Sequence, residues 1–444
     1  MKRRDESYQD SLRRLFPDEN HQELKPGGNF VRNITFQVTE ACSMACTYCY
    51  QHDKTPRRMS FETGKKFIDL LLEPSEKSVG YINSVECPGC VLEFIGGEPF
   101  LEIDLIDQLT DYFIERCMIL NHPWATRYKI SFTSNGLHYF EPKVQKYLNK
   151  HFGNVSLTIT IDGNKELHDS CRLDLNGKPT YDRAIAAADD WAKRIGQANN
   201  RSKVTLAPGN IHLTSKALVD LIEHGYEVIH CNCVYEKGWE PEHATTLYNE
   251  LKVVADYLLD NKLHDKIYLS ILDGVAGEPI PEVQTHPWCG GSGLMMCASP
   301  DGNIYPCLRY APSSVGQDIE PLVIGNVDDG FLATSEQQQI MKCMQCVTRQ
   351  LQFSGKPCAT CPIASGCGDC AAYSWEDTGK IGERTTYHCE MHKARVLAMT
   401  YYNNKKYIFN DDPTRFVMHT PKEWALPIIG QEEYERLLLL TEVK

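Results

Sequence analysis

The sequence predicts an α/β protein in which a partial (β/α)6 barrel precedes a cysteine-rich C-terminal region. Between residues 33 and 280, strand-like and helix-like segments alternate along the chain. Repeated βα units form a parallel sheet with right-handed crossovers, which favours a partial or full barrel. After residue 281 this alternation stops, and ten of the 19 cysteines fall between Cys289 and Cys389. A region with so few core-forming repeats is expected to be stabilised by bound metal.

Each βα unit combines an apolar strand with an amphipathic helix. The expected strands are residues 34–38, 91–97, 128–136, 155–163, 203–208 and 227–234. The expected helices are residues 61–72, 103–120, 141–152, 181–195, 216–225 and 243–262. The chain is expected to divide into an N-terminal extension (1–32), the barrel (33–280), the cysteine-rich region (281–395) and a helical tail (396–444). In such barrels the loops at the carboxyl ends of the strands carry the chemistry.

The composition excludes several classes of protein. The 444 residues include 46 Lys and Arg against 59 Asp and Glu, a net charge of −13, whereas nucleic-acid binders are normally basic. No stretch approaches the roughly 18–20 apolar residues of a membrane helix. The first residues, MKRRDESYQDSLRRLF, lack the apolar core of a secretory signal. We therefore expect a cytoplasmic protein, in which disulfides are rare and many of the cysteines bind metal.

Three cysteines directly follow the first expected strand. Cys42, Cys46 and Cys49 form a CxxxCxxC run in the segment TEACSMACTYCYQ. Cysteine thiolates hold iron–sulfur clusters, and three of them leave one iron of a cubane open to a small molecule. The alternatives are a zinc site with a remote fourth ligand and three unrelated core cysteines.

This loop resembles that of radical S-adenosylmethionine (SAM) enzymes, whose hallmark is CxxxCxxC after the first strand of a partial barrel. The resemblance implies a [4Fe–4S] cluster on the three cysteines, with SAM chelating the fourth iron through its amino and carboxylate groups. Electron transfer would then cleave SAM to methionine and a 5′-deoxyadenosyl radical, which abstracts a substrate hydrogen. Tyr48 would lie beside the adenine.

The ends of the next strands match the same family in order. Gly96, Gly97 and Glu98 end the second strand; glycines let the backbone approach a ligand, and the carboxylate can accept from the SAM amine. The family's other SAM-binding positions correspond to Ser134, Asn135, Asp162 and Arg172. Ser134 and Asn135 match the ribose and carboxylate contacts, and Arg172 matches an arginine near the SAM carboxylate. Without the resemblance, GGEP would be only a turn and Arg172 a surface ion-pair partner.

The C-terminal cysteines contain the CxxC spacing of tetrahedral sulfur sites, which hold zinc or iron–sulfur clusters. Their arrangement resembles the SPASM domain, a twin-cluster extension of radical SAM enzymes that modify peptides and proteins. The resemblance implies auxiliary cluster I on Cys289, Cys307 and Cys370. It implies auxiliary cluster II on Cys358, Cys361, Cys367 and Cys389. The step from Cys367 to Cys370 is one residue shorter than in the SPASM pattern.

The other cysteines carry weaker signals. Cys297 could complete cluster I, but it lies in a strand-like run; without it, one iron would be open to a substrate thiolate. The pairs Cys87/Cys90, Cys231/Cys233 and Cys343/Cys346 could be redox pairs, a zinc site or ordinary thiols. Buried or incidental thiols suffice for Cys117 and Cys171.

Within this group the chain resembles maturases of ribosomally made, cysteine-containing peptides, in the branch with CXXX-repeat precursors. We expect intramolecular thioether formation, as in sactipeptides or ranthipeptides, and a reducing electron donor of the flavodoxin or ferredoxin type. Nucleic acid and membranes are not expected partners. The alternatives are an anaerobic sulfatase-maturating enzyme, a maturase that forms carbon–carbon crosslinks, and a non-enzymatic electron carrier or zinc scaffold. About 32 residues precede the first strand, so leader recognition is expected from a separate protein, the barrel surface or the C-terminal tail.

Overall fold

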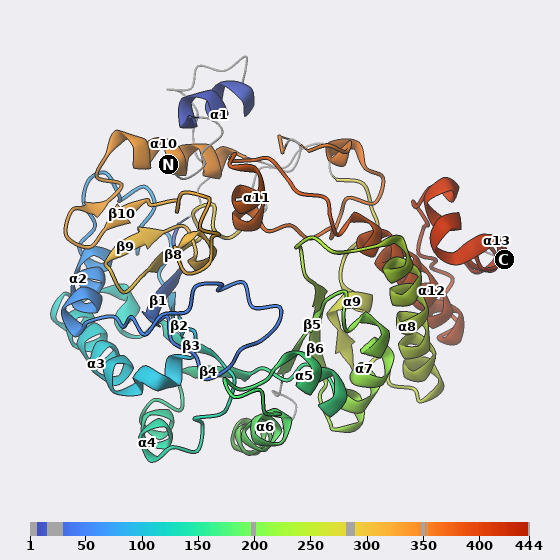
Figure 1. Cartoon of the computed structure of the whole chain (residues 1–444), viewed down its shortest axis with the longest axis horizontal. Coiled ribbons are helices and arrows are strands. Elements are labelled where there is room, and N and C mark those ends of the chain that lie inside the picture. The colour runs from blue at the N-terminus through green and yellow to red at the C-terminus, as the bar shows by residue number, and fades with distance from the viewer. Residues whose placement is uncertain are drawn as a thin grey trace.

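The computed structural model describes residues 7–15, 30–196, 201–280, 289–347, 351–352 and 354–442, and it confirms the predicted fold class. The six barrel strands are β1 (Asn33–Thr39), β2 (Cys90–Gly96), β3 (Tyr128–Ser134), β4 (Val155–Ile159), β5 (Arg201–Leu206) and β6 (Val228–Cys233). The helices that follow them are α2 (Phe61–Leu72), α3 (Ile103–Ile119), α4 (Pro142–Lys150), α5 (Lys165–Cys171) with α6 (Tyr181–Ile195), α7 (Thr214–Glu223) and α8 (Pro241–Asp260). Figure 1 shows these helices outside the strands, with the long loop after β1 crossing the middle of the molecule.

The barrel strands form two sheets. Strands β1 to β4 pair in parallel in one sheet, and β5, β6 and β7 (Tyr268–Leu269) pair in parallel in the other. Side chains connect the two sheets between β4 and β5: Ser202 Oγ donates to the carbonyl of Ile161 (2.7 Å), and the Thr205 amide donates to Asp162 Oδ1 (2.9 Å). The position of β5 beside β4 therefore depends on the segment around Asp162.

The larger sheet continues into the cysteine-rich region. Strand β8 (Met295–Ala298) pairs in parallel with β1, with Met295 opposite Asn33. The antiparallel strands β9 (Asn303–Tyr305), β10 (Gly325–Asn326) and β11 (Gly330–Phe331) extend the sheet further. The predicted domain boundary adjoins residues 281–288, which lie outside the described residues, and the sheet spans both sides of it.

The remaining helices attach the two ends of the chain to this body. The C-terminal helices α12 (Cys389–Phe409) and α13 (Lys422–Thr441) pack against α8, and the predicted boundary at residue 395 falls inside α12. Near the other end, α1 (Tyr8–Leu15) lies on α10 (Ser335–Cys346), and Arg14 donates to the carbonyl of Ile381 (2.7 Å). No helix in the described ranges has the length and apolar character to span a bilayer.

Aromatic side chains fill the space between the first three strands and their helices. The ring of Phe94 on β2 lies 5.2 Å from that of Phe36 on β1 and 5.9 Å from that of Phe132 on β3. All three side chains are buried. Because the three strands end at the same edge of the sheet, this packing also fixes the positions of the loops that follow them relative to one another.

Replacing Phe94 by Ala is expected to lower the free energy of unfolding by roughly 3–5 kcal/mol, because it removes a buried ring and leaves a cavity. Urea denaturation followed by circular dichroism measures this change. Phe140, whose side chain is 57% exposed, gives the matched control, and Phe140→Ala should change the same quantity by about 0.5 kcal/mol or less. Equal effects of the two substitutions would contradict this account of the core.

Candidate SAM and cluster site

One cavity of about 180 Å³ collects the side chains that follow the barrel strands. The carboxyl ends of parallel strands meet at one edge of a sheet, so residues far apart in the sequence face one space. The predicted residues that line this cavity are Cys42, Cys46, Tyr48, Cys49, Gly96, Gly97, Glu98, Ser134, Asn135 and Arg172. Asp162 is fully buried beneath the cavity and does not line it.

The two glycines at the end of β2 bring this strand against the cysteine loop. A Cβ atom on Gly96 would lie 2.4 Å from the carbonyl oxygen of Thr39, and one on Gly97 would lie 2.3 Å from that of Ala41. The Gly97 amide donates to Thr39 (3.1 Å), and the Glu98 amide donates to Ala41 (2.9 Å). These glycines were expected to admit a ligand; they also line the cavity, but their tightest contacts are with the start of the cysteine loop.

Glu98 is buried and accepts three hydrogen bonds. Its Oε1 accepts from Ser134 Oγ (2.8 Å) and the Phe100 amide (3.1 Å), and its Oε2 accepts from the Asn135 amide (2.8 Å). Burial raises the pKa of Glu98, and these hydrogen bonds oppose that rise. A carboxylate can accept about four hydrogen bonds, so Glu98 retains capacity for one further donor such as an ammonium group.

A buried network joins the cysteine loop to β4 and to the turn after α5. The Tyr48 hydroxyl donates to Asp162 Oδ2 and accepts from Arg172 Nη1 (2.7 Å). Arg172 Nη1 and Asp162 Oδ2 lie 3.7 Å apart. No described residue accepts from Arg172 Nε, which is buried. Arg172 thus lines the cavity from a fixed position, and its guanidinium group has the charge that pairs with a ligand carboxylate.

The three loop cysteines approach one another at the cavity wall. Burial raises the pKa of the Cys42 thiol to about 11, and the Lys54 ammonium group opposes this rise. The pKa of Cys46 is also raised by burial and by Cys49, and it is lowered by Arg172. Bound metal would deprotonate these thiols outright.

The sulfur atoms of the described cysteines are not spaced as they would be around a bound zinc ion. Tetrahedral zinc with bonds of about 2.3 Å would bring its sulfur ligands to about 3.8 Å from one another. Across the described residues, which include all nineteen cysteines, no three cysteine sulfurs lie within 4.8 Å of one another. The one group with such spacing is Asp107, Asp111 and His151, where the Lys150 ammonium group already bridges the two carboxylates.

Nine of the residues that line the cavity were not predicted from the sequence, and they include Gln51, Lys54, Lys203 and Thr205. Lys54 donates to the carbonyl of Met44 (3.2 Å), and Gln51 donates to the carbonyl of Gly96 (2.8 Å). Lys203 and Thr205 reach the cavity from β5. Lysine, glutamine and threonine are common surface residues, so only their position beside the cysteine loop and at a strand end distinguishes them.

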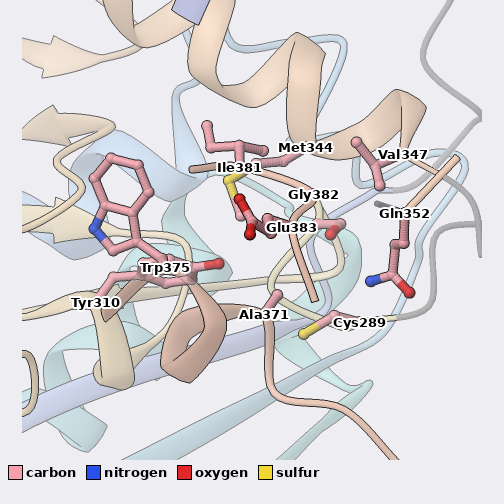
Figure 2. A pocket seen from close by; sticks show the side chains of 11 residues that line it. Cys289, Tyr310, Met344, Val347, Gln352, Ala371, Trp375, Ile381, Gly382 and Glu383 are labelled. Carbon is pink, nitrogen blue, oxygen red and sulfur yellow. The ribbon is translucent and has the colours of Figure 1, made fainter. Parts of the chain in front are cut away.

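The structure also brings together the cysteines expected to hold auxiliary cluster I. Burial raises the pKa of Cys289 to about 11, with Cys370 adding to the rise. Burial also raises the pKa of Cys307, and the nearby Cys289 and Cys370 raise it further. Beside Cys289, a small pocket of about 30 Å³ is lined by apolar and aromatic side chains that include Tyr310, Met344 and Trp375 (Figure 2).

The four cysteines expected to hold auxiliary cluster II lie on two neighbouring segments. Cys358 begins a short helix that ends just before Cys361, and Cys389 begins α12. Burial raises the pKa of Cys389, and Cys367 adds to this rise. Arg384 Nη2 donates to Cys367 Sγ (2.9 Å), a contact that the sequence did not predict.

The remaining cysteines take other positions, and no disulfide joins any of the nineteen. Cys297 is fully buried in β8, in keeping with its strand-like surroundings in the sequence. Cys231 and Cys233 line a second cavity of about 350 Å³ between β6 and the C-terminal helices. The positions of the rest vary from buried to partly exposed: Cys87, Cys90, Cys117, Cys171, Cys343 and Cys346.

Sequence relatives of the chain include maturation enzymes. It is 23% identical over 357 residues to the mycofactocin maturase MftC of Mycolicibacterium smegmatis, covering 76% of this chain and 78% of that protein. It is 24% identical over 311 residues to a cysteine-type anaerobic sulfatase-maturating enzyme of Clostridium perfringens, covering 66% and 76%. A match of 27% over 150 residues to an uncharacterized protein of Methanocaldococcus jannaschii spans 34% of this chain and 45% of that protein. No model of a known protein family matches the chain.

Solved structures show the same fold. The structure of native anSMEcpe with bound AdoMet and Kp18Cys peptide superposes with a TM-score of 0.59 at 17% identity, covering 86% of this chain and 99% of that one. SuiB of Streptococcus suis bound to the precursor peptide SuiA gives a TM-score of 0.51 at 14% identity, covering 81% and 76%. The chain is thus similar in sequence and in fold to maturases of peptides and sulfatases, and the resemblance to radical SAM enzymes noted in its sequence is confirmed.

Replacing Gly97 by Ala should disrupt the cysteine loop, because the added methyl group would meet the Ala41 carbonyl at 2.3 Å and Cys42 Cβ at 2.7 Å. Overpacking of this kind costs about 1–3 kcal/mol. We expect a lower thermal midpoint and less iron per chain after anaerobic reconstitution. Gly153→Ala is the control, since no atom lies within 4 Å of its added Cβ. Full iron content in the Gly97 variant would refute the close approach.

Replacing Asp162 by Asn should leave the Arg172 guanidinium group buried without its anion, at a cost of roughly 3–5 kcal/mol in unfolding free energy. Chemical denaturation of the variant and the parent measures the difference. Asp182→Asn removes an exposed ion pair with Lys165 and should hardly change the same midpoint. If the two substitutions lower the free energy of unfolding by equally small amounts, the buried network does not stabilise the fold as stated here.

Proposed function

We propose that this protein is a radical SAM maturase that forms intramolecular thioether crosslinks from the cysteines of a ribosomal precursor peptide. The proposal rests on one observation: three cysteines, a buried carboxylate and a buried guanidinium group line the same cavity. This set matches the chemistry of SAM, which presents an ammonium group and a carboxylate to be bound and oriented.

Each residue has a definite part in this proposal. Cys42, Cys46 and Cys49 would hold a [4Fe–4S] cluster, which when bound would supply the electron for reductive cleavage of SAM. Glu98 accepts from the SAM amine with its remaining acceptor position, and the Arg172 guanidinium group faces the SAM carboxylate. Tyr48, held by Asp162, forms the wall beside the adenine. Ser134 and Asn135 complete the site through their hydrogen bonds with Glu98.

We further propose that the C-terminal cysteines hold two auxiliary clusters. Cys289, Cys307 and Cys370 would supply three ligands to the first of these clusters, which would leave one iron for the thiolate of a substrate cysteine. A thiolate bound to iron is already deprotonated and needs no separate base.

A second candidate function is sulfatase maturation, in which a cysteine or serine is oxidised to formylglycine. It is favoured by the relatives and the superposed structure named above, which include sulfatase-maturating enzymes. Both candidates use the same cavity. They differ in the product, because a thioether removes two hydrogens and blocks the thiol, whereas formylglycine replaces the side chain by an aldehyde.

The substrate is tested with the short open reading frames that neighbour the coding sequence. Co-expression with a cysteine-repeat peptide should yield a product lighter by two hydrogens per crosslink, and alkylating reagents should no longer label its cysteines. Mass spectrometry measures both changes. An aldehyde on a sulfatase-derived peptide, with the cysteine-repeat peptide unchanged, would support the second candidate and contradict the first.

The cluster content gives a separate prediction. Three cubanes require about twelve irons and twelve sulfides per chain after anaerobic reconstitution. Replacing Cys42, Cys46 and Cys49 together by Ala should remove about a third of the iron and abolish 5′-deoxyadenosine formation. Replacing Cys87 and Cys90, which belong to none of the three sets, should leave the iron content unchanged. One zinc ion per site and no iron in the parent protein would contradict the proposal.

A further inference from the structure

The segment between α11 (Ala371–Thr378) and α12 buries an arginine against the proposed auxiliary cluster II. Arg384 is 3% exposed, and its Nη2 donates to Cys367 Sγ (2.9 Å) and to the carbonyl of Gly368 (2.6 Å). Its Nη1 is buried and has no hydrogen-bond partner among the described residues. Arg384 therefore presents both a positive charge and N–H donors to a cysteine sulfur.

This charge has no carboxylate in direct contact with it. Within the described ranges Arg384 forms no ion pair, and the Asp369 carboxylate, which accepts from Gln352 (3.0 Å) and Ser374 (3.2 Å), acts on it from a greater distance. A guanidinium group removed from water costs several kcal/mol unless an anion faces it. Thiolates and an iron–sulfur cluster would be such an anion, and Arg384 is placed to face it.

A second arginine, which is half-buried, contacts the loop that carries Cys367. Arg395 of α12 donates to the carbonyl of Gly366 (3.1 Å) and to those of Ser270 (2.9 Å) and Ile271 (3.0 Å). None of its described partners is a carboxylate. The loop that carries Cys367 is thus flanked by two guanidinium groups that form no ion pair within the described ranges.

The cysteines of the proposed auxiliary cluster I have a different surrounding. Arg309 Nη1 approaches Cys370 Sγ at 3.6 Å, but its Nη2 forms an ion pair with Glu236. The Arg309 guanidinium group also lies 4.8 Å from the ring centre of Tyr50. Its hydrogen bond to sulfur is longer than that of Arg384, and its charge is largely neutralised.

We propose that Arg384 is a positioning residue that raises the reduction potential of the cluster held by Cys358, Cys361, Cys367 and Cys389. The inference rests on the cluster ligands given under the proposed function. One-electron reduction makes a cluster more negative by one charge, and a buried cation with an N–H···S bond stabilises that reduced state. Arg309 exerts a weaker influence of this kind on the other auxiliary cluster.

The test is a redox titration with dithionite, followed by electron paramagnetic resonance. It uses the full chain with Cys42, Cys46 and Cys49 replaced by Ala, so that only the auxiliary clusters report. Arg384→Gln should lower the equilibrium constant for reduction of one cluster at least tenfold, which lowers the reduction potential of that one-electron couple by about 59 mV. The potential of the other cluster should not change. Arg309→Gln should shift the other couple, by less.

Two results would overturn the inference: no shift in the Arg384→Gln variant with its iron retained, or an equal shift of both couples. If this variant loses iron, Arg384→Lys replaces it, because lysine keeps the charge without the planar fork. The lysine variant should shift the same couple in the same direction by a smaller amount, and an unchanged potential would equally overturn the inference.

Iron content separates this failure from failure of the proposed function. The chain without the first three cysteines should hold about eight irons, and Cys367→Ala in that background should reduce the number. If Cys367→Ala leaves the iron unchanged, the ligand assignment is wrong. If the iron falls while Arg384 variants keep the parent potential, only the tuning role is wrong.

Discussion

The fully buried carboxylate of Asp162 connects more parts of this structure than any other side chain described above. It accepts from the Thr205 amide across the break between the two sheets and from the Tyr48 hydroxyl of the cysteine loop, and it faces Arg172. The open side of the barrel, the cysteine loop and the cavity guanidinium group therefore share one anchor. A buried charge is tolerated only when it is paired and hydrogen-bonded. Movement of any one of these parts would therefore leave the buried Asp162 carboxylate without a partner, at a cost in free energy.

The glycines after β2 impose a second constraint on the same loop. Their missing side chains let the loop carbonyls of Thr39 and Ala41 accept from the Gly97 and Glu98 amides. The start of the cysteine loop is thus held by backbone hydrogen bonds and its middle by the Tyr48 network. A loop fixed at both places can present three thiols to one side without help from a bound group, and Glu98 is carried to the cavity by the same contacts.

The local parts of this arrangement were predictable from the sequence. Six strands and their helices follow from periodicity, and the cavity residues follow from motifs that stand at strand ends. The pairing of β8 with β1 was not predictable. Strand β8 has only four residues and lies far from β1 in the sequence, so nothing in its local sequence indicates which strand it pairs with. The break between β4 and β5 also depends on side-chain bonds rather than on pattern. Arg384 lies seventeen residues beyond Cys367 in a segment without a motif, so only the folded chain reveals its contact with sulfur.

The central claim is that three thiols leave one iron for SAM, and electron paramagnetic resonance of the dithionite-reduced, reconstituted protein tests it most directly. Addition of SAM should change the signal of one cluster, because its amino and carboxylate groups would enter the coordination sphere of that cluster. The change should vanish when Cys46 is replaced by Ala and persist when Cys367 is replaced. A spectrum that SAM leaves unchanged in the reconstituted parent protein would contradict the account.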